Sequence, residues 1–304
     1  MTFVNMPMAI LRGRLSAGPR RASPWDSREP IREELFSAER IEEHARSLAV
    51  AQPVTPEPIR KHPLTARLAQ NGAILLDAYR SMVEAIDEGR ALTPAAEWLV
   101  DNYHLVEKQI REIRSDLPAG YYRELPKLAA GPLAGYPRVF GTAWAFVAHT
   151  DSRFDSEMLR RYMRAYQEVQ PLRIGELWAV SITLRIVLIE NLRRLAEQSV
   201  DSRLARQRAD AVADRLLGTG GRAAEAVAAV LGAHESARLP DAFAVQLVHR
   251  LRDQDPRLTP ALVWLDQRLA VPDRDEAAAQ PTHELGHQAG LSDTRLPLDE
   301  HHRG

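Results

Sequence analysis

Residues 94–154 decide the fold, with the sequence PAAEWLVDNYHLVEKQIREIRSDLPAGYYRELPKLAAGPLAGYPRVFGTAWAFVAHTDSRF. The first part carries apolar residues at i, i+4, i+7, i+11 and i+14, which is one face of a helix. These residues are Leu99, Tyr103, Val106, Ile110 and Ile113. Thr93 is placed to cap this helix, and Pro94 suits a first turn whose backbone N–H has no partner. The pattern therefore predicts an amphipathic helix that begins at residue 94.

The second part of the stretch is interrupted by proline and glycine between Ser115 and Pro137, which excludes one continuous helix. A short helix fits between these breaks at residues 121–129. The apolar run at 139–149 predicts a buried helix, and Asp155 can cap a further helix at 156–169. The stretch thus predicts several helices of different burial packed together.

Outward from this stretch, residues 1–63 read as a proline-rich lead-in with one short helix near 31–50. Residues 64–270 read as a helical domain, and 271–304 have no sustained apolar period, so we expect disorder there. The further helices are expected at 63–88, 174–198, 203–217, 222–234, 240–252 and 258–270. The predicted fold class is all-α, a multi-helix bundle or an irregular array of helical hairpins without significant sheet.

The composition limits the function and the location of the chain. A net charge of −1 argues against a nucleic-acid partner, and the absence of cysteine removes disulfides and thiolate chemistry. The N-terminal apolar residues precede the basic ones, which is the reverse of a secretory signal. The longest uncharged apolar runs fall short of the ~20 residues that cross a bilayer. We expect a cytoplasmic protein, or one peripheral at an inner membrane, without a signal peptide or transmembrane helix.

One literal metal motif occurs in the C-terminal tail, where His283, Glu284 and His287 form H-E-x-x-H. On a helix the two histidines would bind zinc, and the glutamate would act as general base. Gly286 and Gly290 weaken such a helix, and no apolar face accompanies it. We interpret the motif as incidental, which leaves a zinc peptidase as a remote alternative, and we predict no cofactor.

Two carboxylates on the apolar helix at 174–198 invite comparison with a glycosidase. Glu176 and Glu190 are 14 residues apart, or about 21 Å along a helix, whereas glycosidase pairs lie roughly 5–9.5 Å apart. We expect Glu190 to pair with Arg194 at i+4, and Glu176 to serve the start of its helix.

Aromatic residues at helical spacing favour core packing for Trp98, Tyr103 and Trp144. His149 and the acidic residues after it are expected to form a helix end with its caps. Packing explains four residues of the central stretch least well, so we treat them as candidate ligand-binding residues without assigned chemistry. They are Tyr121, Tyr122, Glu124 and Arg138.

The longest runs resemble the N-terminal region of cyclic β-1,2-glucan synthases, over about residues 25–270. The runs that carry the resemblance are TPAAEWLVDNYHLVEKQIREIRSDLPAGYYRELPKLA (93–129), GYPRVFGTAWAFVAHTDSRFD (135–155) and QPLRIGELWAVSITLRIVLIENLRRLAE (170–197). These synthases are large bacterial inner-membrane enzymes that polymerise glucose from UDP-glucose into cyclic β-1,2-glucan. The resemblance implies a helical region that precedes membrane segments and a transferase domain.

The family's transferase motifs, membrane helices and phosphorylase acid have no counterpart here, so no catalytic residue is carried over. The resemblance predicts a non-catalytic fragment whose partner is the transferase module or membrane part of a glucan synthase. A stand-alone scaffold that binds a glucan or a protein is the alternative. The tail after residue 270 departs from the family, and we expect a truncated or frame-shifted gene product.

Overall fold

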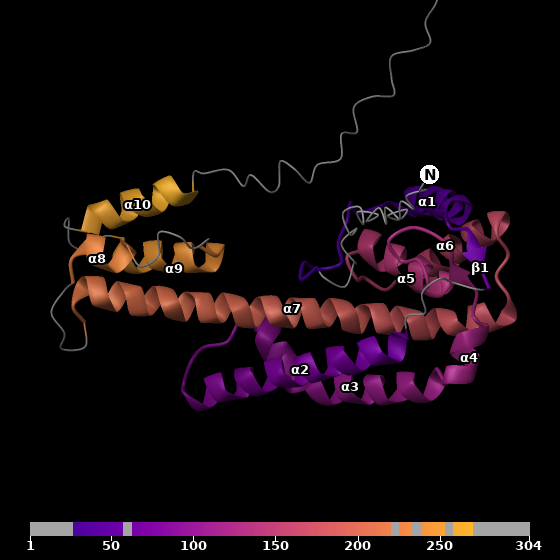
Figure 1. The fold of residues 1–304 in the computed structure, drawn as a ribbon, viewed down its shortest axis with the longest axis horizontal. Helices are drawn as coiled ribbons and strands as arrows, with labels where there is room; N and C mark the ends of the chain where they lie inside the picture. Colours follow the sequence, from indigo (N-terminus) through magenta and orange to yellow (C-terminus); the bar gives the residue numbers. More distant parts are fainter. Residues whose placement is uncertain (1–26, 57–62, 220–224, 233–238, 253–257, 270–304) are drawn as a thin grey trace, which may run out of the picture. The chain divides into compact units, whose positions relative to one another are not determined.

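The computed structural model describes residues 27–56, 63–219, 225–232, 239–252 and 258–269. The chain divides into two compact units, residues 1–207 and 208–304. Within the described residues there are ten helices and a single two-stranded sheet (Figure 1). The predicted all-α class is confirmed.

The first unit begins with α1 (Ala38–Ala51), which packs on α6 (Ser156–Val169) and α5 (Arg138–His149). Helix α5 is buried along nearly its whole length, as its apolar sequence predicts. Asp155 caps α6 by accepting hydrogen bonds from the backbone N–H groups of Glu157 and Met158 at 2.8 and 3.0 Å. His149 ends α5 and stacks on Phe36 with ring centroids 3.9 Å apart. The expected helix end with its caps is therefore present.

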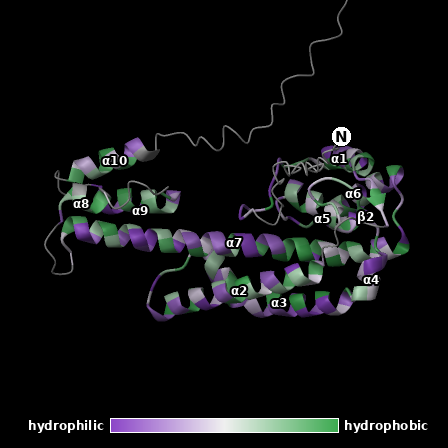
Figure 2. Ribbon diagram, in the orientation of Figure 1, coloured by the Kyte–Doolittle hydropathy of each residue, from purple (hydrophilic) through white to green (hydrophobic). Residues whose placement is uncertain are grey.

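Helices α2 (Leu64–Asp87) and α3 (Pro94–Asp116) form a hairpin. Gly89, at φ 69°, follows α2 in the left-handed region, where a Cβ would be strained. Thr93 caps α3 by accepting a hydrogen bond from the Ala96 N–H at 3.3 Å, and Pro94 occupies the first turn. The alternating green and purple of both helices in Figure 2 reflects the amphipathic pattern from which they were predicted.

The segment after α3 is less helical than its sequence suggested. Helix α4 (Ala119–Glu124) ends before Leu125, and β2 (Lys127–Leu128) pairs antiparallel with β1 (Val54–Thr55). Pro126 explains the early end, because a residue before proline avoids the helical region. The prediction of a helix over 121–129 is therefore wrong in its second half. The sheet that forms there instead has only two residues per strand.

Helix α7 (Ile174–Leu217) has 44 residues and is continuous where we expected separate helices at 174–198 and 203–217. Residues 199–202 contain neither proline nor glycine, so nothing in the backbone chemistry interrupts the helix. In the first unit α7 contacts helices on several sides. Its side chains contact α2 through Glu190 and Arg67, α3 through Arg185 and Asp116, and α5 through Thr183.

The second unit holds the end of α7 from residue 208, with α8 (Val227–Gly232), α9 (Asp241–Leu251) and α10 (Thr259–Leu269). Its core is apolar, and it includes Val212, Leu231 and Phe243. Asp210 accepts hydrogen bonds from Gln246 and Arg250, which ties α9 to this end of α7.

None of the helices among the described residues is both long enough and apolar enough to cross a membrane. The predicted tail at 271–304 lies outside the described residues.

Candidate functional site

Arg138, one of the four candidate ligand-binding residues, is buried at the start of α5 and fully engaged inside the protein. Its Nε and Nη2 donate to the two carboxylate oxygens of Glu176 at 3.0 and 2.7 Å, and Nη1 donates to Gln170 at 2.7 Å. A planar guanidinium that binds a carboxylate with two parallel hydrogen bonds fixes both partners strongly. Arg138 therefore joins α5 to α7.

Glu176 has a second role in the same place. Its Oε2 accepts a hydrogen bond from the backbone N–H of Arg173 at 3.0 Å, immediately before α7 begins. A glutamate in the first turn that reaches back to the capping residue satisfies a backbone donor that has no helical partner. The expectation that Glu176 serves a helix start is confirmed.

Tyr121 converges on the same turn, because its hydroxyl donates to the backbone carbonyl of Gly175. Tyr122 is mostly covered, its ring lies 4.3 Å from the Lys127 ammonium, and burial raises the pKa of its phenol. Glu124 is exposed on α4. The structure thus brings Tyr121 and Arg138 together at the first turn of α7, and places Tyr122 and Glu124 separately.

A second polar centre surrounds Glu190, halfway along α7, and its side chain is fully buried. Arg67 donates to both of its oxygens at 2.9 Å, and Asn71 donates to one of them at 2.8 Å. Arg193 and Arg194 donate to Oε1 at 2.7 and 3.0 Å. The predicted i, i+4 pair of Glu190 with Arg194 is confirmed, while the partners from α2 were missed.

The surroundings of Glu190 determine its charge. Burial by itself would raise its pKa, but the hydrogen bonds and charges of Arg67 and Arg193 prevail and lower the pKa to about 2. The carboxylate is therefore ionised at neutral pH and has no proton to give. This centre is suited to holding α2 and α7 together, and it does not form an acid–base pair with Glu176.

The partners of Glu190 could not have been found from spacing alone. Arg67 and Asn71 lie four residues apart on the face of α2 that meets α7, so their pattern marks one helix face. Which helix that face meets depends on the tertiary packing.

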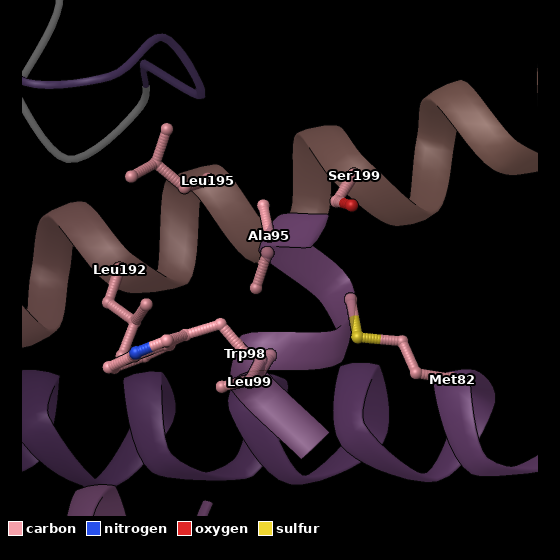
Figure 3. Close-up of a pocket in the computed structure, with 8 residues that line it drawn as sticks. Met82, Ala95, Trp98, Leu99, Leu192, Leu195 and Ser199 are labelled. Carbon is pink, nitrogen blue, oxygen red and sulfur yellow. The ribbon is translucent and has the colours of Figure 1, made fainter. Parts of the chain in front are cut away.

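A cavity of 240 Å³ lies between the end of α2, the start of α3 and the middle of α7 (Figure 3). Its lining is almost entirely apolar, and comprises Met82, Ala95, Trp98, Leu99, Leu192, Leu195, Ala196 and Ser199. Trp98 and Leu195 form its exposed margin, with 52% and 46% of their surface accessible. The prediction that Trp98 is a core residue is therefore wrong, because its side chain is exposed at the margin of the cavity.

The core packing predicted for Tyr103 and Trp144 agrees better with the structure. Tyr103 stacks on Tyr79 with ring centroids 4.5 Å apart, and Trp144 lies 5.2 Å from the Arg194 guanidinium. Both are partly buried and pack against the core.

Among the residues that the structure describes, no group of three or more His, Cys, Asp or Glu side chains is close enough together to hold a metal ion. His283, Glu284 and His287, which we judged incidental, lie outside the described residues.

The fold and these sites define a mostly helical protein whose deeply buried carboxylates are committed to arginines and whose apolar cavity opens to solvent. No family model matches the chain. It is 36% identical over 248 residues to the cyclic beta-(1,2)-glucan synthase NdvB of Rhizobium meliloti (strain 1021). The match covers 82% of this chain and 9% of the synthase, so the chain spans less than a tenth of that relative's length. The resemblance to this family of synthases is confirmed.

Proposed function

We propose that this chain is a helical scaffold or regulatory module in the synthesis of cyclic β-1,2-glucan. The transferase that polymerises glucose from UDP-glucose would be a separate module. The observation that carries the proposal is the 36% identity over 248 residues to part of a cyclic beta-(1,2)-glucan synthase. Similarity at this level over a long stretch supports a shared fold and a shared place in such an enzyme.

The chemistry of the buried carboxylates supports a role without catalysis. Glu176 is bound by Arg138, and Glu190 by Arg67, Arg193 and Arg194. Side chains held in this way fix helices in position but are not available to a substrate. We infer that this region supports the reaction by packing against the part of the synthase that performs it.

A chimera tests the proposal directly. The matching region is deleted from the Rhizobium meliloti synthase, and in a second version it is replaced by this chain. We expect deletion to reduce the production of cyclic glucan in membranes and replacement to restore it, with product measured by chromatography. A deletion that leaves both the amount and the ring size unchanged would contradict a supporting role.

A second assay addresses catalysis by the chain alone. The purified chain is incubated with UDP-glucose and a divalent cation, and release of UDP is measured. We expect no release above that of the buffer. Transfer of glucose by this chain without the synthase would overturn the non-catalytic assignment.

We also propose that the chain is peripheral at the inner membrane through the membrane or transferase part of the synthase. Cell fractionation checks this location. The chain should sediment with membranes that contain the deleted synthase, and remain in the supernatant with membranes that lack it.

The stand-alone glucan-binding alternative rests on Tyr121 and Tyr122. Its support is weaker, because the Tyr121 hydroxyl is engaged by Gly175 and the Tyr122 ring is covered by Lys127. Calorimetric titration with cyclic β-1,2-glucan distinguishes the two functions. Heat of binding that disappears in Tyr121→Ala and Tyr122→Ala, but persists in Glu124→Ala, would favour the alternative.

A further inference from the structure

Helices α3 and α7, which line the cavity together, each carry a row of apolar side chains that are exposed or partly buried. Trp98 and Leu105 lie seven residues apart on α3 and are 52% and 47% exposed. Leu188, Leu192 and Leu195 follow one face of α7 at the spacing i, i+4, i+7. Leu195 is exposed, and the other two are partly buried against the core. We call these five residues the apolar seam.

The two helices run antiparallel along the seam. At one end Trp98 shares the cavity with Leu192 and Leu195. At the other end Arg185 of α7 donates to Asp116 of α3 at 2.7 Å, and closes the seam with a charged contact. The distance along α3 from Trp98 to Gln109, which also contacts Arg185, is about 16 Å at 1.5 Å per residue. A partner helix of three turns matches this length.

The cavity supplies an anchor point within the seam. Its 240 Å³ exceeds the ~150 Å³ of an engineered apolar cavity that admits benzene. One large apolar side chain therefore fits beside Trp98 (Figure 3). An amphipathic helix that lies in an apolar groove with residues at i, i+3/i+4 and i+7 is an established mode of recognition.

The rim of the seam at the cavity end is acidic. Glu97 and Asp101 flank Trp98 on α3, and both are exposed. A basic residue on the partner helix would lie against these two carboxylates. Such a charge pair favours the correct orientation of the partner helix more than it increases the affinity.

Most of the synthase that this chain resembles has no counterpart in the chain, since the match covers 9% of that protein. Apolar side chains that are exposed beside a pocket often mark the binding site of a partner. The absent part of the synthase is the occupant that both observations fit.

We propose that the apolar seam binds an amphipathic helix from another part of a cyclic β-1,2-glucan synthase, with one large apolar side chain in the cavity and a basic residue against Glu97 and Asp101. This inference rests on the proposed function and deepens it by naming the surface through which the module acts. Trp98 is the expected centre of the interface, because a large aromatic side chain beside a pocket commonly dominates binding.

The test measures binding of the purified chain to the Rhizobium meliloti synthase from which the matching region is deleted, held in detergent. Trp98→Ala and Leu195→Gln are compared with Trp178→Ala, a matched control. Trp178 is 71% exposed on α7, beyond the Arg185 contact and outside the seam. We expect the two seam variants to raise the Kd roughly thirtyfold, the effect of losing a strong interface residue, and the control to change it less than about twofold. Circular dichroism confirms that each variant is folded.

The outcomes separate the two proposals. If the wild-type chain does not bind the deleted synthase, the proposed function fails, and the seam fails with it. If the wild type binds and the seam variants bind equally well, the function stands and the seam assignment is overturned. Equal losses in the seam variants and in Trp178→Ala also overturn the seam.

Two other occupants are checked with the same proteins. Light scattering that shows a dimer of the wild type and a monomer of Trp98→Ala would assign the seam to a second copy. Binding that appears only after removal of residues 1–26 would assign the seam to that segment. Either result overturns the proposal.

Discussion

Two regions of helix α7 depart from the usual distribution of side chains in opposite directions. Around Glu190, the carboxylate is buried together with Arg193 and Arg194, and Arg67 is partly buried, although charged groups normally lie at the surface. Five residues further along, Leu195 forms the exposed margin of the apolar seam. The buried charges are paired with one another, whereas the described residues leave these apolar side chains exposed. The first region explains how α2 and α7 are held together, and the second is the surface that we propose for a partner.

Removal of the buried carboxylate should have the largest effect on stability. Glu190→Gln removes the carboxylate that Arg67, Arg193 and Arg194 share, and we expect the free energy of unfolding to fall by about 3–5 kcal/mol. Urea unfolding followed by circular dichroism measures the change. Glu107→Gln is the control, since it breaks an exposed pair with Arg111 at 3.3 Å and should cost about 0.5 kcal/mol or less. Equal losses would show that the Glu190 centre does not specify the fold.

The same carboxylate should make the protein sensitive to acid. The pKa of Glu190 is about 2 in the folded protein, compared with an ordinary value of 4.5. Because the folded pKa is the lower one, the stabilisation is fully present above pH 4.5 and is lost as the pH falls toward 2. We expect a loss of roughly 3 kcal/mol across this range from this group. Unfolding measured at a series of pH values should show a shallower dependence for Glu190→Gln, and parallel curves would contradict the assignment.

A smaller effect is expected where the candidate ligand-binding residues meet α7. Tyr121→Phe removes the hydrogen bond to the Gly175 carbonyl, and should lower the free energy of unfolding by about 1 kcal/mol. Glu124→Gln, on the exposed side of α4, should change it very little. Thermal unfolding of both variants gives the comparison. Identical melting temperatures for Tyr121→Phe and the wild type would remove the structural role assigned to Tyr121.

The smallest effect on stability should come from the apolar seam. Trp98 is half exposed, so Trp98→Ala should change the free energy of unfolding by less than about 1 kcal/mol. Urea unfolding measures this change, and binding to the deleted synthase should fall at the same time. A large loss of stability would mean that Trp98 serves the core, and the contrast between the two regions of α7 would disappear.

Local sequence signals predicted most helices correctly. Thr93 with Pro94 and the Asp155 cap identified helix starts, and the apolar sequence after residue 174 identified the first half of α7. The predictions failed where a local rule was overlooked or overapplied. Pro126 ends α4 early because the residue before proline avoids the helical region. A helix boundary was expected after residue 198, although residues 199–202 carry no helix breaker.

The candidate site was less predictable than the fold. Tyr121 and Arg138 were selected as residues that packing explains poorly, and the structure shows that both are held by the first turn of α7. Trp98 was assigned to the core because aromatic residues at helical spacing are usually buried. A periodic pattern identifies the face of a helix, but it does not state whether another element covers that face.

The sequence by itself determined the helices, their caps and the resemblance to a cyclic β-1,2-glucan synthase, because these follow from local spacing and from the order of residues. Only the tertiary structure decided which charges are buried and which apolar residues are exposed. Arg67 and Glu190 are 123 residues apart in the chain, and Trp98 and Leu195 line one cavity from two different helices. Contacts between such distant residues depend on how α2, α3 and α7 pack.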